Sequence, residues 1–249
     1  VITNPLPDPA ISPGNPALFC PGASVTLTST GKGNAIGFNG PVRYVEVPDY
    51  SGLNVSQITL EVWVYTTNTN HQFIFTKGNF QYCLNLYYGG LIYFGTRNST
   101  GGYETAWPVN KSVPLNTWTH LACTHDGSMM RVYMNGELLC SYPHNGLYTA
   151  DSGTSIIGQY PVMQSDLQFN GNLDELRIWD VAKTQDEIIA SMYSEVPPDA
   201  ANLTAYFKFD ESTGTTALNS ASPANSGTLV NNPVWVTPST APFAYSYLW

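Results

Sequence analysis

The chain has 249 residues, and its 18 acidic and 9 basic residues give a net charge of −9. Hydrophobic residues make up 43% of it and aromatic residues 13%, so the composition is that of a folded protein with a large core. Nucleic acids and anionic membrane surfaces are excluded as partners, because both select clustered lysine and arginine. Neutral ligands, cations and basic partners remain open. The length allows one large β domain or two ordinary domains.

Short strands with turn residues between them recur from residue 33 onward. The strongest strand patterns lie at residues 43–49, 58–66, 71–78, 81–88, 90–97, 118–127, 130–142, 155–160 and 173–180. We expect type I′ hairpin turns at Asp126-Gly127 and Asn135-Gly136, because both central positions of that turn need a positive φ. Regular short strands of this kind predict an all-β sandwich or jelly roll with two antiparallel sheets.

One short helix is predicted at residues 184–193. Thr184 and Glu187 form a capping box, in which each side chain satisfies a backbone donor of the first turn. An apolar stripe at helical spacing follows between Ile188 and Met192, and the prolines beyond it prevent the helix from continuing. Residues 203–216 and 227–236 then predict further strands around a Ser/Asn/Gly loop.

No segment reaches the roughly 18 apolar residues of a membrane-spanning helix, and the Pro-rich start lacks the pattern of a secretory signal. We interpret the chain as a mature or excised soluble fragment, and its composition favours an extracellular setting. The four cysteines form no C-x-x-C pair, which gives a zinc or redox site no support. They are Cys20, Cys83, Cys123 and Cys140. Four cysteines allow three complete sets of disulfides, which the sequence does not rank. A bond between Cys123 and Cys140 is a reasonable one.

Several blocks of the sequence resemble, in order, those of the LamG-like, concanavalin A-like jelly-roll family. They are GNAIGFNGPVRYVEVPD (33–49), LEVWVY, NTWTHLACTHDGSMMRVYMNGELL and GNLDELRIWDVAKTQDEI. The resemblance covers about residues 33–236 and implies a jelly-roll domain over residues 32–237. It departs from the family at Pro41-Val42-Arg43, where an acidic residue usually precedes the tyrosine, so a ligand role for that acid is absent here.

The flanks resemble a second family, the Ig-like repeats of adhesins of Bacteroidota. LFCPGASVTLTST (18–30) is similar to one strand block of these repeats, and AYSYLW (244–249) is similar to the next block. The resemblance implies that residues 1–31 hold a Pro-rich leader and the first part of an Ig-like domain. Residues 238–249 would hold a linker and the next Ig-like strand, with the jelly roll inserted between them in a longer surface protein.

Catalysis finds little support. A retaining glycosidase needs two carboxylates about 5–5.5 Å apart, which a strand supplies from alternate residues on one face. Asp174 and Glu175 are adjacent, so we expect them on opposite faces of a strand. We therefore predict that the chain is not an enzyme. A polysaccharide-degrading enzyme whose carboxylate pair is assembled by folding is the less favoured alternative.

Calcium is the cofactor that the resemblance implies, in a structural role. Its ligands would be the carboxylate of Asp174 and backbone carbonyls near Asn39 and Gly40, and hard oxygens of this kind suit Ca²⁺. The histidines show no spacing of metal ligands, and we expect structural roles for all four. They are His71, His120, His125 and His144.

Carbohydrate binding is the function we favour, because sugars are held by aromatic faces and a few directional hydrogen bonds. Trp107 lies in a loop-like segment, 99–110, outside the family's core blocks, and tyrosines surround Gly89-Gly90 in numbers that strand alternation cannot bury together. The candidate ligand-binding residues are Trp107, Tyr103, Arg97, Tyr87, Tyr88 and Tyr93.

These inferences predict a non-catalytic carbohydrate-binding or adhesion module of a large secreted or cell-surface bacterial protein. We expect a monomeric module that binds a glycan or polysaccharide and has no nucleic-acid partner and no membrane insertion. A protein-binding or structural spacer module, in which the aromatic face is filled, is the first alternative.

Overall fold

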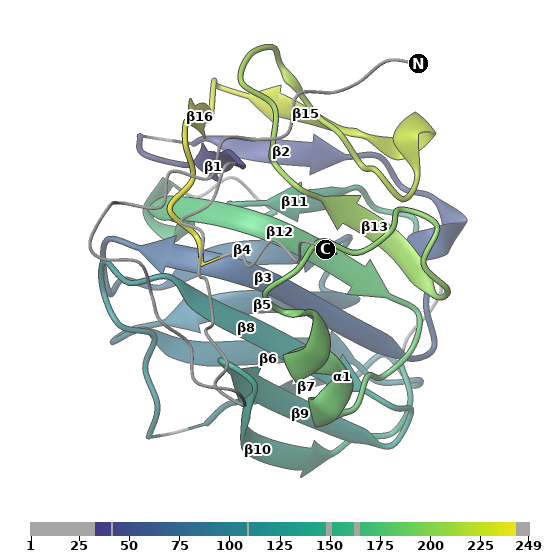
Figure 1. The fold of residues 1–249 in the computed structure, drawn as a ribbon. Helices are drawn as coiled ribbons and strands as arrows, with labels where there is room; N and C mark the ends of the chain where they lie inside the picture. The colour runs from purple at the N-terminus through teal and green to yellow at the C-terminus, as the bar shows by residue number, and fades with distance from the viewer. Residues whose placement is uncertain (1–32, 41, 109, 148–150, 162–164, 243–249) are drawn as a thin grey trace, which may run out of the picture.

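The computed structural model describes residues 33–40, 42–108, 110–147, 151–161 and 165–242 (Figure 1). The two predicted Ig-like strand blocks, 18–30 and 244–249, and Cys20 lie outside these residues. Among the described residues, no helix is long and apolar enough to cross a membrane.

The described chain forms two sheets of eight strands, and every pairing between these strands is antiparallel. The first sheet has the spatial order β10 (Glu137–Pro143), β9 (Met129–Met134), β8 (Thr119–His125), β3 (Ile58–Thr66), β12 (Gly171–Trp179), β1 (Ala35–Gly37) and β16 (Val234–Val236), and β13 (Leu203–Phe207) also pairs with β12. The second has the order β14 (Thr216–Ala217), β15 (Gly227–Val230), β2 (Tyr44–Val47), β11 (Ser155–Ile157), β4 (Gln72–Lys77), β5 (Tyr82–Tyr87), β6 (Leu91–Arg97) and β7 (Tyr103–Ala106).

One continuous hydrophobic core fills the space between the two sheets. Val62 and Val64 of β3 contribute to it from the first sheet, and Leu84 and Ile92 of the second sheet contribute from β5 and β6. Because side chains alternate along a strand, the residues between these core positions point outward, away from the opposite sheet. The predicted all-β sandwich of two antiparallel sheets is therefore confirmed.

The predicted helix is also confirmed, as α1 (Gln185–Ser191). Thr184 is its N-cap, and the capping box with Glu187 is present in both directions. Short 3-10 helices at Ser51–Leu53, Ser165–Leu167 and Pro223–Asn225 complete the regular elements. Helix α1 lies on the outer face of the first sheet (Figure 1), where Ile188 packs with Ala122 and Tyr133.

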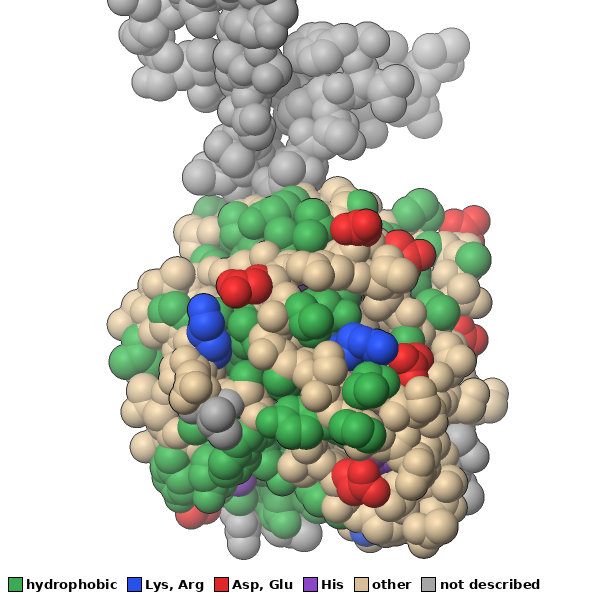
Figure 2. Space-filling view, turned by 90° about the horizontal axis from the view of Figure 1, so that it is seen from below, with side chains coloured by type: hydrophobic (Ala, Val, Ile, Leu, Met, Phe, Trp, Pro, Cys, Tyr) green, Lys and Arg blue, Asp and Glu red, His purple; other side chains and the backbone are tan. Residues whose placement is uncertain are grey.

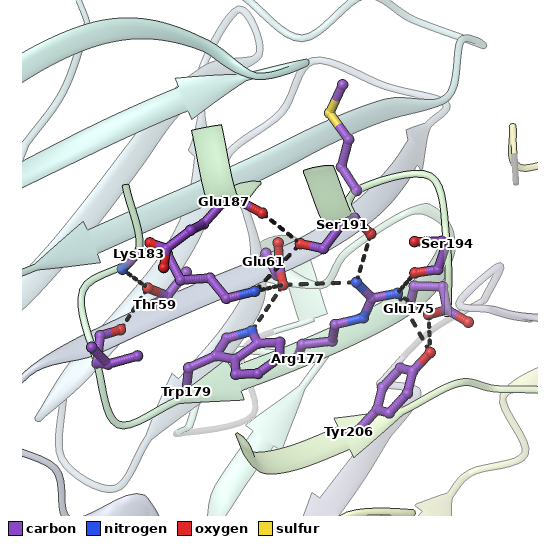
Figure 3. A network of polar contacts seen from close by, with 12 residues as sticks. Thr59, Glu61, Glu175, Arg177, Trp179, Lys183, Glu187, Ser191, Ser194 and Tyr206 are labelled. Atoms are coloured by element: carbon purple, nitrogen blue, oxygen red, sulfur yellow. Dashed lines mark hydrogen bonds and ion pairs between the residues drawn. The ribbon is translucent and has the colours of Figure 1, made fainter. Parts of the chain in front are cut away.

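A buried polar network joins α1 to that sheet (Figure 3). Arg177 of β12 donates to Glu175 at 2.6 Å and to the carbonyls of Ser191 and Ser194 at 3.1 and 2.7 Å. Glu61 of β3, which is 0% exposed, accepts a 2.8 Å hydrogen bond from the indole of Trp179. The network fixes the segment after β12, which includes α1, against the first sheet. This segment covers the outer face of that sheet, the face turned away from the second sheet.

Two local predictions about the strands are wrong. The type I′ turn is present at Asn135-Gly136, where both φ angles are positive, but Asp126 does not have a positive φ. Its carboxylate instead accepts from the backbone N–H groups of Ser128 and Met129, which makes a longer loop between β8 and β9. The segment 99–110 is not a loop throughout, since residues 103–106 form β7.

The predicted disulfide between Cys123 and Cys140 is absent. Cys83, Cys123 and Cys140 are free thiols. Val132 of β9 lies opposite both Cys123 and Cys140, so β9 separates the strands that carry them. Two strand spacings are about 9.6 Å, whereas the Cα atoms of a disulfide lie within about 7 Å of each other.

Candidate carbohydrate site

An aromatic pocket of about 400 Å³ lies on the outer face of the second sheet. Its volume falls in the range of small-molecule sites, and seven of its ten lining residues in the described chain are Phe, Tyr or Trp. The lining residues, which define the aromatic pocket below, are His71, Phe73, Phe80, Asn85, Tyr87, Tyr93, Arg97, Tyr103, Trp107 and Tyr160.

Strand alternation explains why these side chains share one face. On β5 the core residues Leu84 and Leu86 point inward, so Asn85 and Tyr87 point outward. On β6 Phe94 points inward and Tyr93 points outward, and the register places Tyr93 directly opposite Asn85. The sheet surface thus supplies Asn85, Tyr87 and Tyr93, and Phe80, Trp107 and Tyr160 reach the pocket from beyond the strand ends.

One wall of the pocket is a cluster of three rings from three successive strand segments. The ring centroids of Trp107 and Tyr87 are 5.8 Å apart, those of Trp107 and Tyr93 are 6.0 Å apart, and those of Tyr87 and Tyr93 are 6.3 Å apart. Trp107 follows the last residue of β7 directly, which sets its indole beside the outward face of β6. Half-buried rings of this kind offer apolar faces to the C–H surface of a sugar.

The opposite wall carries a strained residue. Phe80, in the turn between β4 and β5, has a φ of 61°, a left-handed conformation that a bulky side chain adopts at a cost of about 1–3 kcal/mol. Its ring packs against Phe73, Tyr103 and Tyr160 at centroid distances of 6.1, 6.0 and 5.5 Å. These contacts hold Phe80 over the pocket. Such strain is concentrated at binding sites.

The floor of the pocket depends on a glycine. Gly95 of β6 lies opposite Cys83 of β5, and the phenol of Tyr103 lies directly over it. The hydroxyl of Tyr103 is 3.1 Å from the Cys83 sulfur, and a Cβ built on Gly95 would lie 2.0 Å from that hydroxyl. Only glycine leaves room for this arrangement. Burial raises the pKa of Cys83 to about 11, so this sulfur is a thiol and not a thiolate at neutral pH.

Gly95→Ala is therefore expected to displace Tyr103 and to weaken ligand binding. The added methyl group forces a buried contact to move, which costs about 1–3 kcal/mol of stability. The measurement is a double-mutant cycle: Gly95→Ala should do much less harm in a Tyr103→Ala background, where the Cys83 sulfur, 3.1 Å from the added methyl group, is the remaining close neighbour among the described residues. Equal damage in both backgrounds would show that the clash is not with Tyr103.

The pocket contains few charged groups. Burial lowers the pKa of His71, whose Nε2 lies 3.2 Å from the Asn85 amide oxygen, so the ring is neutral at pH 7. Arg97 is then the charged side chain among the lining residues, and none of the described residues that line the pocket is a carboxylate. The face of the molecule seen in Figure 2 has scattered Lys, Arg, Asp and Glu side chains among hydrophobic and uncharged polar ones.

The structure brings five of the six predicted ligand residues into the pocket. These are Trp107, Tyr103, Arg97, Tyr87 and Tyr93. Tyr88, which is 60% exposed, lies at the rim, and its ring centroid is 5.1 Å from that of Tyr87.

Four further lining residues were not singled out from the sequence: Phe73, Phe80, Asn85 and Tyr160. His71, for which a structural role is predicted, also lines the pocket, with its ring 4.9 Å from that of Tyr87. Alternation was the signal that could have found Asn85, two residues before Tyr87 on β5. The other three histidines are buried among protein groups, as predicted: His120 contacts Glu61, and His125 bonds to His144 at 2.7 Å.

The predicted calcium ligands do not come together. Gly37 pairs with Asn172 in an antiparallel ladder, so the position opposite Asp174 is Ala35. Asn39 is four residues from Ala35, which is about 13 Å along a strand. The Gly40 carbonyl accepts from the side-chain amide of Gln168, and the Asp174 carboxylate accepts from the Ser239 hydroxyl at 2.6 Å. These residues do not fit a shared Ca²⁺ ion.

The expectation that Asp174 and Glu175 face opposite ways is also wrong. Glu175 has a φ of 53°, and the register between β12 and β3 shifts between Asp174 and Arg177, which marks a β-bulge. A bulge interrupts alternation, so both carboxylates leave the core side. Both are enclosed, at 4% and 5% exposed, and Glu175 is bonded to Arg177 and Tyr206. The bulge therefore does not create an accessible catalytic pair.

The fold is a sandwich of two antiparallel sheets with an aromatic pocket on one outer face, and comparison with known families agrees with this fold. Residues 39–189, more than half of the chain, match the family model Laminin_G_3 of the concanavalin A-like lectin/glucanases superfamily. The chain belongs to this family. The predicted LamG-like, concanavalin A-like identity is thus confirmed.

Solved structures show the same fold. A Bacteroides ovatus protein, to which carbohydrate binding has been provisionally assigned, superposes with a TM-score of 0.70 at 23% identity, over 88% of this chain and 62% of that one. Domain 4 of the extracellular arabinanase AbnA of Geobacillus stearothermophilus, solved with arabinotriose, has a TM-score of 0.51 at 23% identity, over 68% of this chain and 81% of that one. The CBM40 of the Ruminococcus gnavus IT-sialidase, bound to α2,3-sialyllactose, has a TM-score of 0.50 at 17% identity, over 63% and 95%.

Mouse pappalysin-1 is similar in sequence over a shorter stretch. It is 26% identical over 102 residues, which are 40% of this chain and 6% of pappalysin-1. The chain therefore corresponds to a small part of that relative and to about three fifths of the Bacteroides ovatus protein.

Proposed function

We propose that the chain is a non-catalytic carbohydrate-binding module whose glycan site is the aromatic pocket. The observation that carries the proposal is the cluster of Tyr87, Tyr93 and Trp107, three half-buried rings within 6.3 Å of one another on a sheet surface. Such rings bind the C–H faces of sugars, while Asn85, His71 and Arg97 supply hydrogen-bonding groups beside them. The carbohydrate-binding proteins among the structural neighbours support the same function.

The lack of a lining carboxylate supports a non-catalytic role. Glycoside hydrolysis needs an acid and a second carboxylate beside the scissile bond, and none of the ten lining residues in the described part of the chain is Asp or Glu. The extracellular arabinanase and the sialidase among the neighbours also carry sugar-binding parts, which fits the proposed setting in a secreted or cell-surface protein. The insertion between Ig-like strands and the adhesin context remain part of this proposal.

A glycan-array screen of the whole chain tests the proposed function. We expect binding to one class of glycan, in calcium and in EDTA alike, because the rings need no ion for stacking. A melting curve in both buffers tests calcium separately, since a bound structural ion would raise the melting temperature by mass action. Binding to no glycan on the array would contradict the proposal and favour the protein-binding or spacer module.

A further inference from the structure

Arg97 is a cation without a carboxylate partner. Two of the three other arginines form ion pairs: Arg131 lies 2.6 Å from Asp126, and Arg177 lies 2.6 Å from Glu175, whereas Arg43 forms none among the described residues. Among the described residues Arg97 forms no ion pair, and its Nε is buried without a hydrogen-bond partner. A guanidinium that is partly withdrawn from water without a counter-charge is costly, which indicates that a ligand supplies the missing acceptor.

The nearest acid in the sequence is held on the other side of the sheet. Glu104 lies opposite Thr96, whereas Arg97 lies opposite Tyr103, so Glu104 and Arg97 occupy opposite faces. Glu104 accepts a 2.7 Å hydrogen bond from Asn98, and its other oxygen lies 4.0 Å from His144. It is therefore engaged elsewhere and does not neutralise the guanidinium.

A second unsatisfied polar group lies beside Arg97. Gln81 is 0% exposed, and neither its side-chain nitrogen nor its oxygen has a hydrogen-bond partner in the described chain. The backbone carbonyl of Gln81 accepts a 3.0 Å hydrogen bond from the backbone N–H of Arg97. Gln81 precedes Cys83 by two residues, so its side chain points to the same side of the sheet as the pocket. Buried amides are nearly always hydrogen-bonded, so Gln81 is a second unsatisfied polar group beside Arg97, although it is not among the residues that line the pocket.

The apolar and cationic ends of the pocket are separated along β6. Tyr93 and Arg97 are four residues apart, which is about 13 Å along a strand, and the Tyr103 phenol lies over Gly95 between them. This span is longer than one sugar ring. A ligand that uses both ends must present an apolar ring face and, further along, an anionic group.

We propose that the aromatic pocket binds an acidic oligosaccharide. Arg97 pairs with the carboxylate of one sugar residue, and Tyr87, Tyr93 and Trp107 stack on the neighbouring ring. A carboxylate is the planar anion that a guanidinium fork binds through two parallel hydrogen bonds. This inference rests on the proposed carbohydrate function and adds the chemical class of the glycan. Because the chain as a whole carries a charge of −9, selection of an anion must come from this local contact and not from long-range attraction.

The test is calorimetric titration of the chain with tri-galacturonic acid and its neutral methyl ester, and with 3′-sialyllactose and lactose. These pairs distinguish a uronic acid from a sialic acid as the source of the carboxylate. We expect one acid to bind at least tenfold more tightly than its neutral counterpart, and Arg97→Met to remove about ten- to a hundredfold of affinity for that acid alone. Arg97→Lys should restore part of the loss.

Lys111→Met is the matched control, because it also removes one positive charge from a side chain that is 51% exposed and outside the pocket lining. It should leave the affinity unchanged. The inference is overturned if Arg97→Met weakens acidic and neutral sugars equally, or if neutral sugars bind as tightly as acids while Trp107→Ala abolishes both. In the second case the carbohydrate function stands. Absence of binding to every glycan would remove both proposals.

Discussion

Trp107→Ala is expected to weaken glycan binding at least tenfold, about 1.4 kcal/mol or more, with little change in melting temperature. The indole is half-buried and contacts Tyr87 and Tyr93 through its ring, but it does not belong to the hydrophobic core between the sheets. Its removal opens one wall of the aromatic pocket and leaves the sandwich intact. Titration with the glycan identified on the array measures the loss, and a melting curve measures the stability.

Trp118→Ala is the matched control for this variant. Trp118 is also a half-buried tryptophan, but it packs on Tyr65 at 5.6 Å and donates to Thr240, away from the pocket. It should retain full glycan affinity. Trp107→Phe should fall between the wild type and Trp107→Ala, because a smaller ring still offers an apolar face. If Trp107→Ala binds as well as the wild type, the glycan site lies elsewhere on the molecule.

The sequence predicts the pocket wall of Tyr87, Tyr93 and Trp107 better than it predicts the wall that carries Phe80 and Tyr160. Alternation places the adjacent Tyr87 and Tyr88 on opposite faces, so the tyrosines around Gly89-Gly90 cannot all be core, and the position of Trp107 outside the core blocks singles it out. These are local properties of single strands, which the sequence records. Five of the six predicted ligand residues consequently lie together in the pocket.

The second wall could not be predicted, because it depends on contacts between distant segments. Tyr160 follows β11, and its ring meets Phe73 of β4 at 4.9 Å. No periodicity in either segment shows that they are neighbours. Phe80 adopts a left-handed backbone that sequence rules assign to glycine or asparagine, so a turn pattern alone gives no reason to place its ring over a pocket.

The failed predictions at β12 have one cause. Strict alternation was assumed through Asp174 and Glu175, and a single bulge at Glu175 invalidated it. A bulge adds one residue to one strand only, so it is visible in the register with β3 and not in the residues themselves. The same bulge lets Glu175 reach Arg177, two residues further along the strand, within the buried network of Figure 3.

Glu61→Gln is expected to be the most destabilising conservative change in the chain. Lys183, Arg177 and His120 lie 3.7, 3.8 and 3.5 Å from the Glu61 carboxylate, which is fully buried. Removing one partner of a buried ionic network leaves the others uncompensated, at a cost of about 3–5 kcal/mol. For a chain of this size that corresponds to a fall in melting temperature of roughly 10 °C.

The pH dependence identifies the charge on Glu61 as the cause. Burial alone would raise its pKa, but the neighbouring His120 imidazole and the positive charges of Arg177 and Lys183 outweigh it and hold the pKa at about 2. Because the folded-state pKa lies below the ordinary value, the contribution of this carboxylate is complete above about pH 4.5 and is lost as the pH falls toward 2. The stability difference between the wild type and Glu61→Gln should therefore be constant from pH 5 to 7 and should shrink below pH 4.5. A difference that persists unchanged to pH 3 would assign the effect to packing.

Because α1 and the aromatic pocket lie on opposite outer faces of the sandwich, the folded variant should bind its glycan with unchanged affinity. A loss of both properties together would instead mean that the two faces are coupled through the core.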